Sequence, residues 1–160
     1  MAHRNSLIFV LLLLLAAACG RPSGNHRFVS TETARENGGV FAFTLSTEDS
    51  AAVYATCVAA RVVRSRIPEE ALEFDIQITP PDGQPTIERQ AFPLSETPGV
   101  KVNLGTGSVT DYEWPWHVIR TSGHPAGVWN IRITPADPAR LEALYGVGFS
   151  YEARTWEKAN

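Results

Sequence analysis

Residues 72–79 alternate strictly between apolar and polar side chains, and this alternation limits the possible folds more than any other feature. The apolar positions are Leu72, Phe74, Ile76 and Ile78. Successive side chains of a β-strand point to opposite faces, so this segment is predicted to be a strand with one buried face. It ends at Pro80-Pro81-Asp82-Gly83, which is typical of a turn because proline fixes φ and glycine accepts positive φ. A strand that is buried on one face only is typical of an antiparallel sheet.

The same alternation recurs along the rest of the chain, with residues that favour turns between the alternating segments. It is found at 41–45, 100–104, 129–133 and 145–151. About eight or nine strands fit into the chain at this spacing. We therefore predict an all-β fold, an antiparallel two-sheet β-sandwich of immunoglobulin-like or related topology over residues 26–160. A small β-barrel is the alternative.

One of these segments also carries a resemblance. Residues 127–133 resemble the penultimate strand of many bacterial β-sandwich domains, in which a tryptophan packs between the two sheets. The resemblance concerns architecture and implies no activity. It implies that Trp129 lies in the core.

Two segments depart from the alternation. Residues 47–65 contain alanines that suit a helix, whereas their alternate valine, alanine and cysteine side chains would share one face of a strand. We favour a long strand, while a helix here would make the fold α+β. Near the C-terminus, Asp137 followed by Pro138 is typical of a helix N-cap with proline at the first helical position. This predicts a short helical turn at 138–144.

The first twenty residues, MAHRNSLIFVLLLLLAAACG, have the organisation of an export signal. Arg4 supplies a positive charge, residues 7–15 form a short apolar segment, and three alanines provide the small side chains that a signal peptidase requires. The apolar segment is too short to remain as a membrane-spanning helix. We therefore predict that residues 1–18 are a signal peptide that is removed during export.

The segment Leu15-Ala16-Ala17-Ala18-Cys19 resembles the lipobox of bacterial lipoproteins. The resemblance implies that the signal is cut before Cys19 and that its thiol is diacylated, which anchors the protein to a membrane. Ala16 departs from the family, which usually has leucine there, and Gly20 in place of aspartate implies the outer membrane of a Gram-negative cell. The polar residues that follow predict a short tether, so that 19–25 form the lipidated N-terminus. An ordinary secretory signal is the alternative.

The second cysteine, Cys57, has no disulfide partner within the chain if Cys19 carries lipid. Its apolar neighbours offer nothing that stabilises a thiolate, so we predict an inert thiol. The formal net charge is −3 and most of the arginines are scattered, which argues against nucleic acid as a partner. We expect contact with the membrane through the lipid and with an envelope protein.

Three of the chain's four tryptophans lie within sixteen positions: Trp114, Trp116 and Trp129. In a strand, every second residue from Tyr112 to Val118 would share one apolar face, and Pro115 predicts an edge strand or a bulge because it cannot donate to a ladder. In the first interpretation the three tryptophans fill the space between the sheets. In the second, Trp116 is exposed and binds a sugar or a partner protein. The candidate binding residues are then Tyr112, Trp114, Trp116 and His117.

The sequence contains no catalytic motif: a nucleophile elbow and a phosphate-binding glycine loop are both absent. His117 and His124 lack the helical spacing of a metal-binding pair, so we predict neither a metal nor a cofactor. We expect a non-enzymatic, lipid-anchored protein of the cell envelope that binds a protein partner or assists assembly. A glycan-binding module for peptidoglycan or a surface polysaccharide is the alternative.

Overall fold

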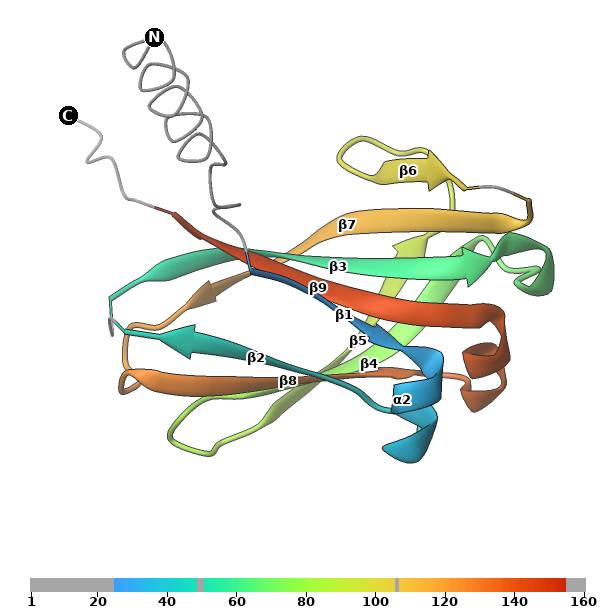
Figure 1. Cartoon of the computed structure of the whole chain (residues 1–160). Coiled ribbons are helices and arrows are strands. Elements are labelled where there is room, and N and C mark those ends of the chain that lie inside the picture. Colours follow the sequence, from blue (N-terminus) through green and yellow to red (C-terminus); the bar gives the residue numbers. More distant parts are fainter. Residues whose placement is uncertain (1–24, 49–50, 106, 155–160) are drawn as a thin grey trace, which may run out of the picture.

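The computed structural model describes residues 25–48, 51–105 and 107–154, whose strands form two facing antiparallel sheets (Figure 1). One sheet has the order β1 (Asn25–Ser30), β9 (Leu144–Arg154), β3 (Val53–Val63), β7 (Val109–Arg120) and β6 (Lys101–Leu104). The other has the order β2 (Phe41–Thr47), β8 (Gly127–Pro135), β4 (Ala71–Thr79) and β5 (Thr86–Pro93). The predicted two-sheet sandwich is thus confirmed, and the alternative of a small closed barrel is wrong. The predicted signal peptide and Cys19 lie outside the described residues.

The segment that the sequence left ambiguous is a strand. β3 pairs with β7 on one side and with β9 on the other, at the centre of the five-stranded sheet. The α+β alternative is therefore wrong. The helical turn predicted near the C-terminus is also confirmed, as the 3₁₀ helix η2 (Pro138–Ala143), in which the Asp137 carboxylate accepts a hydrogen bond from the Ala139 N–H.

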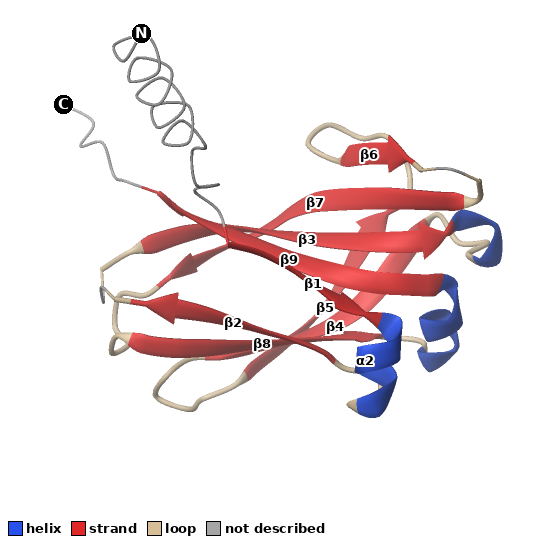
Figure 2. Cartoon of the chain, viewed as in Figure 1, coloured by secondary structure: helices blue, strands red, loops and turns tan. Residues whose placement is uncertain are grey.

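Two other short helices were not predicted. The α-helix α2 (Thr31–Glu36) begins where the Ser30 hydroxyl accepts a hydrogen bond from the Thr33 N–H at 3.2 Å. The 3₁₀ helix η1 (Arg64–Arg66) follows β3. In Figure 2 the helices gather at one end of the sandwich, which we call the helical end.

The core lies between the sheets and is built from the alternating apolar residues. Its largest fully buried side chains are Trp114, Phe41, Phe74, Phe149, Leu45, Ile67, Leu72, Ile76, Ile131 and Ile133. Burial of each large apolar side chain contributes about 1.5–3 kcal/mol relative to exposure. Trp129 of β8 is also buried, which confirms that it belongs to the core.

The opposite end of the sandwich, which we call the loop end, holds the turns at 80–85 and 121–126. The first residue of β1, Asn25, pairs with Tyr151 near the end of β9, so the described chain both enters and leaves at the loop end (Figure 1). Cys19 is six residues before Asn25, and six extended residues span at most about 20 Å. Among the described helices, none has the length and hydropathy that crossing a membrane requires.

Candidate functional site

The two halves of β7 have different surroundings. β6 pairs only with residues 110–113, so residues 114–120 have β3 on one side and no described strand on the other. The pairing with β3 shifts between Ala55 and Cys57, and Cys57 stands opposite Pro115. Of the two interpretations of Pro115, the bulge is confirmed, whereas the edge strand is wrong because β6 lies outside β7, although it does not reach Pro115.

Two of the predicted binding residues, Tyr112 and Trp114, are buried in the core. Their rings are stacked, with centroids 5.5 Å apart and planes within 2°. The Trp114 Nε1–H donates to the Pro93 carbonyl at 2.8 Å, and the Tyr112 hydroxyl donates to the Leu94 carbonyl at 3.3 Å. These rings join β7 to the end of β5 and present no surface to a ligand.

Trp116 is partly buried and connects the two sheets. Its Nε1–H donates to Glu88 Oε1 on β5 at 2.9 Å, and its ring contacts Phe149 edge-on at 6.4 Å. Val118 is 38% exposed while Ile119 is buried, so the apolar face predicted from Tyr112 to Val118 ends at Trp116. The bulge explains this difference, because one extra residue reverses the side on which later residues point.

His117 and His124 both line an open pocket of about 570 Å³ between β5 and the end of β7, which we call the loop-end pocket. Its lining comes from the end of β4, the start of β5, the end of β7, the β7–β8 turn and β8. The apolar lining residues are Ile78, Pro80, Val118, Ile119 and Trp129. The polar lining residues are Gln84, Thr86, His117, Arg120 and His124.

The polar lining of the loop-end pocket offers hydrogen-bond donors and no carboxylate. His124 lies edge-to-face against Trp129 at 4.9 Å, and its Nδ1 contacts Asp82 Oδ2 at 2.6 Å. Trp129 is 5% exposed, yet its indole N–H has no acceptor among the described residues. Arg120 forms no ion pair within the described part of the chain. An acceptor-bearing group suits this lining better than a cation.

β5 is the second exposed edge beside the pocket. Its only neighbour among the described strands is β4, and residues 86–91 are all exposed, with Ile87 70% accessible. Arg89 stands opposite Asp75 of β4 and donates hydrogen bonds to both of its carboxylate oxygens, at 2.8 and 2.9 Å. We call β5 and residues 114–120 of β7 together the open side of the sandwich.

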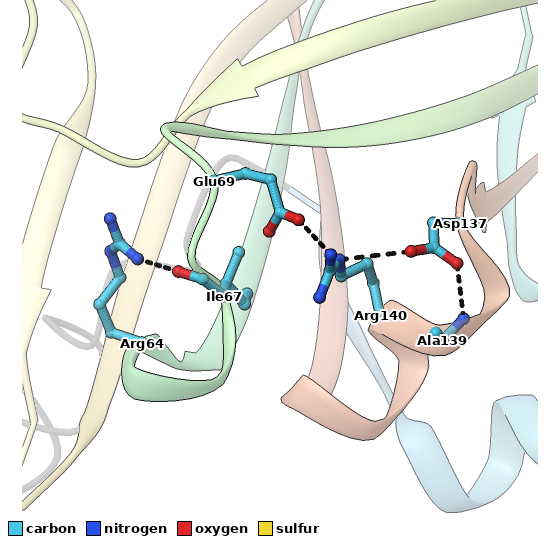
Figure 3. A network of polar contacts seen from close by, with 6 residues as sticks. All are labelled: Arg64, Ile67, Glu69, Asp137, Ala139 and Arg140. Carbon is cyan, nitrogen blue, oxygen red and sulfur yellow. Dashed lines mark hydrogen bonds and ion pairs between the residues drawn. The ribbon is translucent and has the colours of Figure 1, made fainter.

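The helical end carries a different set of polar contacts, which Figure 3 shows. Arg140 of η2 pairs with Glu69, and its Nε lies 3.5 Å from Asp137 Oδ2. Arg64 donates to the Ile67 carbonyl in the turn after β3. Because Arg140 is matched by Glu69 and Asp137, its contacts join η2 to the β3–β4 connection and stabilise this end of the fold.

Cys57 is a free and partly exposed cysteine whose surroundings disfavour its thiolate form. Burial, and then the Glu113 carboxylate, raise the pKa of the Cys57 thiol above its ordinary value, although a hydrogen bond with Ser150 opposes the shift. The described residues contain no cluster of three or more histidine, cysteine, aspartate or glutamate side chains that could hold a metal ion.

The chain was compared with known proteins at the level of families, curated sequences and solved structures. No family model, curated protein or solved structure matches it. The fold therefore defines the protein as an antiparallel two-sheet β-sandwich, and its function must be argued from the open side and the loop-end pocket.

Proposed function

We propose that the protein is a non-enzymatic, lipid-anchored component of the cell envelope whose open side binds a protein partner. The observation that supports binding is the pair of exposed strand edges, β5 and residues 114–120 of β7, which the hydrogen bond from Trp116 of β7 to Glu88 of β5 connects. The lipobox resemblance at Cys19 supports the anchor.

A protein partner suits these edges because an exposed strand offers backbone N–H and C=O groups to another chain. Soluble proteins usually cover or interrupt such edges. Here Pro115 and the bulge interrupt the edge of β7, whereas β5 has no proline before its last residue. A partly buried tryptophan and an arginine next to an edge are also typical of protein interfaces.

Site-specific photocrosslinking in the native cell tests this function. A photoreactive amino acid in place of Ile87 on β5 should give one adduct of defined mass. The matched control is Tyr145 on β9, which is a large hydrophobic residue at the helical end with 53% exposure. Equal adducts at both positions, or none at Ile87, would contradict binding at the open side.

The anchor is tested separately. Cys19→Ser should leave the protein without acyl mass and should move it from the membrane fraction to the soluble fraction. Cys57→Ser should change neither property and serves as the control. An unchanged mass and location in Cys19→Ser would show that the N-terminal signal is not a lipobox.

A glycan is the second candidate. The observation that favours it is that polar side chains and aromatic rings lie next to one another at the loop-end pocket. His117, Gln84 and Thr86 could bond sugar hydroxyls, and Trp116 is the nearby ring with a partly exposed face. Saturable binding of peptidoglycan or envelope polysaccharide that His117→Ala and Trp116→Phe weaken would favour a glycan. Absence of such binding would leave the protein partner.

A further inference from the structure

We propose that the open side binds the free C-terminus of its partner, with the terminal carboxylate at Arg120 and the last side chain in the loop-end pocket. This inference rests on the proposed function, since it specifies the chemistry of the protein partner. Three features of the described residues support it: the charges in the pocket, the direction of the strands that lead to it, and its apolar floor.

The charges select an anionic group. Arg120 is exposed and lines the pocket, where no lining residue is acidic. Two acids adjoin this region and both are engaged: Asp82 contacts His124 at 2.6 Å, and Glu88 accepts from the Trp116 indole N–H at 2.9 Å. Arginine binds a carboxylate through two parallel hydrogen bonds, which makes a terminal carboxylate a fitting partner for Arg120.

The strand directions show which end of a peptide reaches Arg120, and the positive charge of Arg120 then favours the C-terminus. β5 starts at the pocket with Thr86 and runs towards the helical end, whereas β7 runs the opposite way and ends at the pocket with Arg120. A peptide antiparallel to β5 therefore runs towards the pocket and ends there with its carboxylate. A peptide parallel to β5 would instead place its ammonium group beside Arg120.

β5 is the edge that pairs with this peptide. Its eight residues lie in one uninterrupted register with β4, so the backbone groups on its other edge are regularly spaced. The edge of β7 is less suitable because Pro115 has no N–H and the bulge interrupts its register. Trp116 and Glu88, joined at 2.9 Å, lie between the two edges and would contact the side chains of the peptide that face inwards.

The floor of the pocket selects an apolar last residue. Ile78, Ile119 and Trp129 form it, and all three are nearly completely buried. The volume of about 570 Å³ is ample for one large aliphatic or aromatic side chain. The expected ligand is thus an extended peptide that ends in an apolar residue with a free carboxylate.

A peptide pool tests the proposal with residues 20–160, which contain every strand of both sheets. The peptides match the length of β5, end in valine, leucine or phenylalanine and are random elsewhere. They are prepared as free acids and as C-terminal amides. We expect the selected free acids to bind at least about tenfold more tightly than their amides. Arg120→Gln should remove this preference.

Arg132→Gln is the matched control, because Arg132 is exposed on the outer face of β8, outside the pocket. It should bind as the parent does. Equal binding of acids and amides, or an unchanged preference in Arg120→Gln, would overturn the proposal. If no peptide is retained while Ile87 still crosslinks a protein, the proposed function stands and the C-terminal inference fails. If Ile87 gives no crosslink either, both fail.

The chain's own C-terminus is the competing occupant. Arg154, the last described residue, pairs with Val53, and Val53 pairs with Arg120, so Arg154 lies two strands away from Arg120. A chain that ends at Arg154 should bind the peptides as the longer chain does. A large gain in affinity on truncation would assign the pocket to the chain's own C-terminus and would overturn the proposal.

Discussion

Residues 110–113 of β7 have a described strand on each side, whereas residues 114–120 have one on a single side, and two tryptophans differ even within this second part. Trp114 and Trp116 are two residues apart and point into the same space, yet Trp114 is 2% exposed and bonded to the backbone of Pro93, while Trp116 is partly exposed and bonded to the side chain of Glu88. β6 ends before both of them, but the Trp114 ring packs against Tyr112 and Phe92, whereas Trp116 contacts Phe149 edge-on. The comparison teaches that the rings packed around a tryptophan, more than the residue type, decide whether it stabilises the core or borders a site.

Trp114→Ala should have the largest effect on stability. It removes a fully buried ring that stacks on Tyr112 and leaves the Pro93 carbonyl without its donor. We expect the free energy of unfolding to fall by about 3–5 kcal/mol, as for other buried aromatic truncations. Urea unfolding of residues 20–160 measures this change. A loss below about 1 kcal/mol would remove the distinction between Trp114 and Trp116.

Trp116→Ala should cost about 2 kcal/mol, because part of its ring is already in contact with water and less apolar area is lost. Trp116→Phe, which keeps most of the apolar contact with Phe149, should recover part of this loss. The same urea experiment compares both variants with Trp114→Ala. Equal losses for the two alanine variants would show that the open edge does not weaken the packing at Trp116.

Thr56→Val should destabilise the junction between the halves. The Thr56 hydroxyl donates to the His117 carbonyl at 2.7 Å and accepts from the His117 N–H at 3.2 Å, so it satisfies the backbone at the bulge. Valine has the same shape without the hydroxyl, and we expect a loss of about 1–2 kcal/mol. Thr86→Val, at an exposed position of β5, is the control and should change stability by less than about 0.5 kcal/mol. Equal losses would mean that the bulge does not depend on this hydroxyl.

The smallest expected effect is on the reactivity of Cys57, which lies on β3 opposite Pro115 and therefore reports on the environment of the bulge. Because burial and Glu113 raise the pKa of the Cys57 thiol, a smaller fraction of it is thiolate at any pH below that pKa. Iodoacetamide should therefore alkylate Cys57 several-fold more slowly at pH 8 than it alkylates cysteine in a short peptide. When urea unfolds the protein, the alkylation rate of Cys57 should approach that of the peptide cysteine. An alkylation rate in the native protein at or above that of the peptide would contradict the assigned environment.

Much of the fold could be predicted from the sequence because it depends on local alternation and turn residues. The segment 72–79 was expected to be a strand and forms most of β4, and Asp137 with Pro138 identified η2. The favoured strand within 47–65 is β3. The helix α2 was missed because its six residues contain no apolar periodicity, although Ser30 with Thr33 offered a weak capping signal.

The candidate site was less predictable, since it depends on which strands are neighbours. His117 and Trp116 were singled out, but nothing local shows that β6 ends too early to cover them. The bulge opposite Cys57 reverses the sides of Val118 and Ile119, which an alternation continued from Tyr112 cannot anticipate. Arg120 was missed entirely, because one arginine at the end of a strand carries no sequence signal until the pocket is assembled from distant segments.

The entry of β1 at the loop end has a mechanical consequence. A pull on the proposed lipid anchor reaches the described chain at Asn25, the first residue of β1, whose six residues pair with β9 from Asn25–Tyr151 to Ser30–Gly146. Backbone hydrogen bonds lie perpendicular to the strands of an antiparallel pair, so a force along β1 would shear all of them at once. A force across the sheets would instead separate them one after another, so the resistance of the attachment depends on the direction of the load.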